Sequence, residues 1–202
     1  MSNELLVQEL VSVSAITSGS VKNAFLSVDR VLFTPSKLVS EAYENYPLPI
    51  GFGQTISQPL TVALMLEDLA VQEGMRVLDV GCGSGYTTAL LSFLVSSEGF
   101  VVGVERIPEL VEFARSNLQQ ASIDVAVVKA SSSLGLSQEA PFDRILVSAA
   151  AKSVPEKLVS QLAIGGLMVV PVSSSVLTVR KTKTSFEVVK RREGFRFVTL
   201  IE

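Results

Sequence analysis

A glycine-rich turn with an acid on either side is the feature of the sequence that most clearly points to chemistry. The segment 77–86 reads as an apolar strand, the loop Gly81-Cys82-Gly83-Ser84-Gly85 and the start of a helix. Glycines let the backbone approach a ligand closely, and a helix N-terminus presents N–H groups that have no intrahelical partner. The arrangement predicts a loop that binds a nucleotide-like molecule.

The spacing and the charges narrow the choice of ligand. The glycines follow G-x-G-x-G, and Tyr86 stands where the dinucleotide fingerprint needs its third glycine. Asp79 would repel a pyrophosphate, but it suits a cationic amino acid end such as that of S-adenosylmethionine. Glu105 ends the next strand, where a carboxylate can accept hydrogen bonds from both hydroxyls of a ribose. These features favour S-adenosylmethionine over NAD.

Each feature alone has a simpler interpretation. A glycine-rich turn can be a tight connection without a ligand, and Glu105 can be a solvated loop acid. Cys82, a small residue between glycines, suits packing better than chemistry. In a strand–helix–strand context the features together favour cofactor binding, and we assign to it Asp79, Gly81, Cys82, Gly83, Gly85 and Glu105.

The residue types that the chain lacks limit its chemistry further. It has no histidine and a single cysteine, so it lacks the usual near-neutral proton carrier and the commonest metal ligand. Ser-His-Asp hydrolysis and zinc catalysis are therefore disfavoured, and we expect no metal site. Chemistry that relies on a cofactor and needs little proton transfer from the protein fits the composition.

Composition also bears on partners and location. The 202 residues carry 17 basic and 20 acidic side chains, for a net charge of −3, without the long basic stripe of nucleic-acid or anionic-membrane binding. One cysteine cannot form an internal disulfide, and the first residues lack the features of a signal peptide. No run of about 18 apolar residues predicts a membrane span. We expect a cytoplasmic protein.

Hydrophobic periodicity predicts an α/β fold. Residues 1–45 have the spacing of helices and form an expected N-terminal extension, followed by a loop rich in turn formers and a helix over 58–71. From residue 76, short apolar strands alternate with helices, which implies a mostly parallel sheet covered on both faces. The strands are expected at 77–80, 100–104, 125–128, 145–148 and 167–172, with helices after 85, over 108–119 and near 155–162.

The last segments differ from this alternation. Residues 176–180, 186–190 and 195–200 follow one another through short turns without helices, so we expect three antiparallel edge strands. The whole chain is expected to be one structural unit with a Rossmann-like sheet. Its helical extension, 1–45, would pack on a main domain, 46–202.

The run from Ala42 to Pro59, AYENYPLPIGFGQTISQP, closely resembles the signature of the protein-L-isoaspartate O-methyltransferases. The likeness continues through the glycine loop, Val104-Glu105-Arg106, 140–145 and 154–171, and covers roughly residues 20–172. It implies a class I methyltransferase fold and S-adenosylmethionine as methyl donor. It also implies an activity, methylation of L-isoaspartyl carboxylates in damaged proteins as a repair step. Isoaspartyl proteins and peptides would be the partners.

The resemblance also implies roles for single residues. The active-site serine of the family falls on Ser57, with Thr55 beside it. The Ser57 hydroxyl could orient the acceptor carboxylate or the donor, so we also assign Thr55 and Ser57 to cofactor binding. The loop 46–59 would form part of the substrate channel. From its position alone, Ser57 before an apolar helix with Pro59 in its first turn is also a good N-cap, and both roles can coexist.

The chain departs from the family at two places. Ser131, in Ala130-Ser131-Ser132, replaces the acid of a Gly-Asp-Gly segment that contacts the cofactor near its adenine, and Thr199 stands where proline is usual. Two other functions therefore stay open. One is a divergent methyltransferase with another carboxylate substrate, and the other is a catalytically weak module that binds S-adenosylmethionine.

Overall fold

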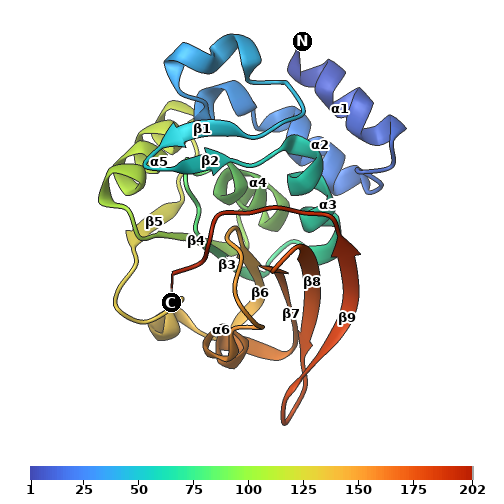
Figure 1. The fold of residues 1–202 in the computed structure, drawn as a ribbon, viewed down its shortest axis with the longest axis vertical. Coiled ribbons are helices and arrows are strands. Elements are labelled where there is room, and N and C mark those ends of the chain that lie inside the picture. Colours follow the sequence, from blue (N-terminus) through green and yellow to red (C-terminus); the bar gives the residue numbers. More distant parts are fainter. Residues whose placement is uncertain (202) are drawn as a thin grey trace.

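The strands predicted from the apolar runs form one seven-stranded sheet, in the order β5-β4-β3-β6-β7-β8-β9 (Figure 1). The computed structural model describes residues 1–201. The first five strands in this order are parallel, and β8 and β9 continue the sheet antiparallel to β7. Their bounds are β3 Arg76–Val80, β4 Phe100–Glu105, β5 Ala126–Lys129, β6 Phe142–Val147, β7 Leu162–Val172, β8 Ser175–Lys181 and β9 Phe186–Glu193. The predicted Rossmann-like α/β class is confirmed.

Helices cover both faces of this sheet, because neighbouring residues of a strand point to opposite sides. Val77 packs into the core beneath the helices α3 to α5, whereas Leu78 packs into the core on the α6 side. Within residues 1–201, no helix is long and apolar enough to cross a membrane. The helices of the main part are α3 Pro59–Leu69, α4 Tyr86–Val95, α5 Pro108–Gln120 and the short α6 Glu156–Gln161, with a 3-10 turn, η3, at Ser137–Glu139.

The N-terminal extension is helical, as expected, and lies over α3 and α4 (Figure 1). Two serines cap its α-helices, because Ser2 and Ser18 accept hydrogen bonds from the backbone N–H groups of Leu5 and Val21. The elements are α1 Asn3–Ser12, α2 Gly19–Ser27 and the 3-10 helices η1 Arg30–Phe33 and η2 Ser36–Glu41.

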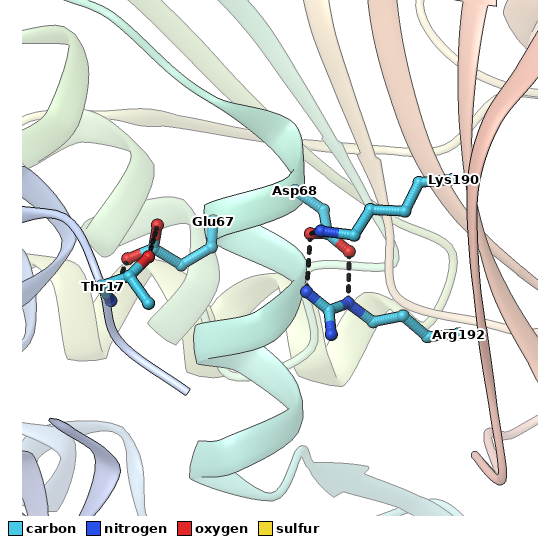
Figure 2. A network of polar contacts seen from close by, with 5 residues as sticks. All are labelled: Thr17, Glu67, Asp68, Lys190 and Arg192. Atoms are coloured by element: carbon cyan, nitrogen blue, oxygen red, sulfur yellow. Dashed lines mark hydrogen bonds and ion pairs between the residues drawn. The ribbon is translucent and has the colours of Figure 1, made fainter. Parts of the chain in front are cut away.

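Two neighbouring acids on α3 bind the N-terminal extension and the C-terminal edge strand (Figure 2). Glu67 accepts hydrogen bonds from the backbone N–H and the hydroxyl of Thr17, at 2.9 Å each, at the entry to α2. Asp68 points to the other side and pairs with Lys190 at 2.6 Å and with Arg192 at 2.6 Å, both on β9. Helix α3 therefore connects the extension to the C-terminal edge strand.

The segment before α3 folds as a separate two-stranded hairpin, β1 Leu48–Gly51 and β2 Gln54–Ile56. The prediction that Ser57 caps α3 is wrong, because the N-cap residue is Gln58, whose side chain makes no capping hydrogen bond. The first turn of α3 is capped instead by Asn45, at the other end of the hairpin, whose Oδ1 accepts the Leu60 N–H at 3.0 Å. Gln58 Nε2 donates to the Asn45 carbonyl at 2.9 Å, which closes the base of the hairpin.

Two expectations for the C-terminal half are also wrong. The strand expected at 167–172 begins earlier, at Leu162, so that β7 includes Gly165 and Gly166. Residues 195–200 form no third antiparallel strand, because the chain turns away from β9 at Gly194, where φ is +89°. The segment instead crosses the carboxyl end of β6, and Ala150 N–H donates to the Val198 carbonyl at 2.7 Å. Its apolar side chains pack on the two cores, a burial that an exposed edge strand would not provide.

Candidate functional site

A cavity of about 360 Å³ lies at the carboxyl ends of the parallel strands β3, β4 and β6. The strand order reverses between β3 and β6, and ligands of open α/β sheets bind at such switch points. Of the residues assigned from the sequence, all line this cavity except Asp79 and Gly85. The lining segments are 54–57, 80–84, 86–87, 104–106, 130–135, 148–149 and 198–201, together with Val62 of α3.

The glycine loop forms the floor of the cavity beside β4. Gly81 and Cys82 donate their backbone N–H groups to the Val104 carbonyl, at 2.8 and 3.2 Å, which fixes the loop against the neighbouring strand. Gly85 does not face the cavity, and a Cβ there would lie 3.3 Å from the Ala114 side chain of α5. Gly85 therefore allows α5 to pack closely, whereas Gly81 and Gly83 face the ligand space.

The hairpin β1–β2 reaches over this loop. A Cβ on Gly83 would lie 3.2 Å from Ile50 Cδ1, so a side chain at this position would press against the hairpin. Gly83 also has a φ of +55°, which glycine adopts without strain. Sequence segments about 30 residues apart are thus brought into contact at the cavity, and only the glycine leaves room between them.

Glu105 is buried, with 6% of its surface exposed, so it is not a solvated loop acid. Its Oε2 accepts the Gly83 N–H at 3.1 Å, and its Oε1 accepts the Arg106 and Ile107 N–H groups at 2.7 and 3.0 Å. A carboxylate has about four lone-pair sites, so after these three hydrogen bonds Glu105 can accept about one more, at Oε2. Glu105 holds the glycine loop and at the same time presents negative charge to the ligand space.

Asp79 lies behind the glycine loop and has no exposed surface. Its Oδ2 accepts the hydroxyls of Thr87 and Thr88, at 2.6 and 2.7 Å, while its Oδ1 is buried without a partner in the described chain. Burial raises the pKa of Asp79 to about 6, against the lowering effect of the two threonine hydroxyls, and the charge of Glu105 raises it further. An unpaired buried carboxylate oxygen favours a cation next to it.

Cys82 is buried between the two acids, with 4% of its surface exposed. Burial raises the pKa of its thiol well above the usual value, and the charges of Asp79 and Glu105 act in the same direction. The thiol therefore stays protonated, and Cys82 contributes an apolar wall without being a nucleophile.

Ser57 and Thr55 reach the cavity from the end of the hairpin. Helix α3, which begins at Pro59, packs against β6 and β7. Because Asn45 supplies the cap of α3, the Ser57 hydroxyl is left available for a ligand.

Ser131 lines the cavity on the opposite side, in the loop after β5. Its hydroxyl accepts the Ser133 N–H at 3.2 Å, so the loop forms a local turn. The preceding residue is tied to β4 through the Ala130 N–H and the Glu105 carbonyl, at 2.8 Å. Ser131 therefore lies on the same side as Glu105, as a residue near the base of a nucleoside would.

The comparison with known families agrees with this geometry. The sequence profile of protein-L-isoaspartate(D-aspartate) O-methyltransferase matches residues 1–202. The chain belongs to the protein-L-isoaspartate O-methyltransferase family. A relative from Methanopyrus kandleri named protein-L-isoaspartate O-methyltransferase is 47% identical over 98% of this chain and 90% of its own length. A second, from Methanothrix thermoacetophila, is 46% identical over 100% of this chain and 95% of its own length.

A solved structure extends the likeness to three dimensions. The crystal structure of a Plasmodium falciparum protein-L-isoaspartate O-methyltransferase in complex with S-adenosyl-L-homocysteine matches with a TM-score of 0.88 and 28% identity. The match covers 100% of this chain and 99% of that one. The predicted class I methyltransferase fold is therefore that of the family, including the helical extension.

Some cavity residues were missed by the sequence reasoning. Ser148 carried a positional signal, because it directly follows β6, and ligand-binding groups gather at the carboxyl ends of parallel strands. Thr87 lies in the first turn of α4, which follows the glycine loop. The segment Val198–Ile201 carried none, since its place over the cavity depends on the turn after β9 and on the bridge to Ala150.

Proposed function

We propose that this chain transfers a methyl group from S-adenosylmethionine to the carboxylate of L-isoaspartyl residues in damaged proteins and peptides. The observation that carries the proposal is the meeting of two motifs in one cavity. The hairpin of the family signature brings Thr55 and Ser57 to the cavity, and the glycine loop and Glu105 line the same cavity. The family supports the reaction, and its P. falciparum member was crystallised with S-adenosyl-L-homocysteine, the demethylated form of the donor.

The residues fit the proposed donor. The buried charge of Asp79 behind the glycine loop suits a cationic amino acid end of the donor, and Glu105 keeps acceptor capacity for a ribose hydroxyl. Gly81, Cys82 and Gly83 would accommodate the donor backbone, and Ser131 would lie near the adenine. When bound, the donor supplies an electrophilic methyl on a cationic sulfur.

The composition suits the acceptor. A carboxylate with a solution pKa near 4 is ionised at neutral pH, so no base is needed to activate it. The work of the chain is to exclude water and to hold the acceptor oxygen in line, since orientation supplies a large share of such rate enhancements. We assign this orienting role to the Ser57 hydroxyl, with Thr55 beside it.

A divergent methyltransferase with another carboxylate substrate, and a catalytically weak binding module, would share the donor side of the cavity. Transfer of labelled methyl to an isoaspartyl peptide and to its aspartyl twin separates the three. We expect base-labile methyl esters on the isoaspartyl peptide alone. Donor binding without transfer would favour the weak module, and transfer to other carboxylates would favour the divergent enzyme.

Ser57→Ala tests the assigned role in the same assay. Because the Ser57 side chain does not cap α3, we expect turnover to fall while the unfolding midpoint stays near that of the parent chain. Asn45→Ala is the matched comparison, since it removes the observed cap and should cost about 0.5–2 kcal/mol of stability. Activity of Ser57→Ala that falls only in step with unfolding would contradict the assignment.

A further inference from the structure

Ser148 follows β6 directly and lines the cavity at the switch point of the sheet. Its backbone N–H donates to the Val80 carbonyl at 2.9 Å, which fixes its position against the end of β3. A Cβ on Gly81 would lie 4.0 Å from Ser148 Cβ, so the side chain stands next to the glycine loop. Unlike the hairpin, this residue is held by the central strands of the sheet.

The Ser148 side chain is half-buried and makes no hydrogen bond to any residue that the structure describes, although it borders the cavity. Ser57 lines the same cavity from the end of the hairpin, just before α3, which packs on β6 and β7. The C-terminal segment closes over this side, since Ala150 is bridged to Thr199. Ser57, Ser148 and Thr199 thus surround one compartment from three separate parts of the chain.

Cations are scarce around this compartment. Within residues 1–201, Arg106 is the one basic residue that lines the cavity, and it follows β4 beside Glu105, away from β6. A carboxylate that leaves water here must be stabilised by neutral donors. Each hydroxyl supplies one donor, whereas a carboxylate can accept about four hydrogen bonds, so Ser57 alone leaves most of them unmade.

Neutral donors also suit the chemistry. A guanidinium or ammonium would stabilise the negative charge that the acceptor oxygen must use in attack, whereas hydroxyls can orient it at a smaller electrostatic cost. The Ser57 hydroxyl alone would hold the carboxylate at one point. A second hydroxyl, on the rigid end of a strand, would also fix the plane of the carboxylate.

We propose that Ser148 is a second acceptor-binding residue, whose hydroxyl donates a hydrogen bond to the isoaspartyl carboxylate from the end of β6 while Ser57 approaches from the hairpin. The inference rests on the proposed function and adds to it a residue for recognition of the acceptor. It places the acceptor carboxylate between the hairpin and β6, and the donor toward β4 and β5.

The test compares the parent chain with Ser148→Ala and Ser148→Cys in methyl transfer to an isoaspartyl peptide, with the affinity for S-adenosyl-L-homocysteine measured separately by calorimetry. Ala removes the hydroxyl, and Cys keeps the shape with only a weak donor. Ser153→Ala is the matched control, because Ser153 is exposed in the same loop and does not line the cavity. Unfolding midpoints show which variants fold. If the Ala variant does not fold, the Cys variant alone provides the test.

We expect both Ser148 variants to lose about tenfold in kcat/KM for the peptide, equal to about 1.4 kcal/mol. Their affinity for the donor product should stay within about twofold, and Ser153→Ala should match the parent. Unchanged kcat/KM in folded Ser148 variants would overturn the inference and leave the proposed function standing. A loss of donor-product affinity that matches the loss of kcat/KM would also overturn it, by placing Ser148 in the donor site. A parent chain that methylates no isoaspartyl peptide would overturn the proposed function and the inference with it.

Discussion

The buried carboxyl group of Asp79 predicts that donor binding depends on pH in a defined direction. The group has no exposed surface, and burial raises its pKa from 3.8 to about 6. Its Oδ2 is saturated by Thr87 and Thr88, whereas Oδ1 has no partner in the described chain. A cationic donor bound in front of the glycine loop, with Asp79 directly behind it, would favour the ionised carboxylate and would lower this pKa again.

Without a bound donor, folding should favour the protonated form of Asp79. Because the pKa of Asp79 is about 6 in the folded chain and near 3.8 when exposed, the folded state binds this proton more tightly than the unfolded state. The stability gained from the protonated group is fully present below pH 3.8 and is lost as the pH rises through 6. The full difference amounts to about 3 kcal/mol.

Donor binding then becomes tighter as the pH rises from 5 to 7. With a pKa of about 6, roughly one molecule in ten has an ionised Asp79 at pH 5, and most do at pH 7. Since the ionised form attracts the cationic donor and the neutral form does not, the apparent dissociation constant should fall over this range by up to about tenfold. An α-amino group has a pKa of about 7.7–8.0, so the charge of the donor hardly changes below pH 7.

Calorimetric titrations with S-adenosylmethionine at pH 5, 6 and 7, each in two buffers of different ionisation enthalpy, measure both the affinity and the protons released. We expect a net release of protons near pH 6 in the parent chain. Asp79→Asn should bind more weakly at pH 7 and should lose the pH dependence, because its side chain stays neutral. A parent chain that releases no proton near pH 6, or an Asp79→Asn variant that keeps the same pH dependence, would show that Asp79 does not control donor binding.

Two further predictions concern the edge strand and the adenine side. Burial would raise the pKa of Asp68, but hydrogen bonds from Arg192 and Lys190 hold it below its usual value. The stability it contributes is therefore present above about pH 4 and lost as the pH falls below that. Asp68→Ala should cost about 1.5–3 kcal/mol in urea unfolding at pH 7, while Glu187→Gln, in an exposed pair, should change little; equal effects would contradict this. Ser131→Asp should tighten S-adenosylmethionine about fivefold, since a charged acceptor adds about 1 kcal/mol over a neutral one, and calorimetry showing equal or weaker affinity would count against it.

Much of the fold and part of the site could be predicted from local sequence. Strands β3, β4 and β5 were placed within one or two residues, because continuous Val and Leu runs and the adjoining glycines act locally. Glu105 was assigned to the donor side for the same reason, since the end of a parallel strand is a fixed location for ligand groups. The 42–59 signature indicated the family, which the match to the whole chain confirms.

The remaining features depend on contacts between distant residues. Ser57 looks like a helix cap in sequence, but Asn45 provides the cap, because the hairpin brings its two ends together. Residues 195–200 have the pattern of a strand, but they cross the end of β6, because their apolar side chains reach both cores there.

The sequence by itself determined the sheet, the donor loop and the family, because alternating apolar runs, glycine spacing and a long local motif act over neighbouring residues. The tertiary structure alone decided which hydroxyls share the cavity and which acid lacks a partner. Ser57 and Ser148 are 91 positions apart in the chain and line one cavity only in the folded chain, where Ser57 comes from the end of the hairpin and Ser148 from the end of β6. The unpaired Oδ1 of Asp79 likewise exists only in the folded chain, where burial removes the water that would otherwise solvate it.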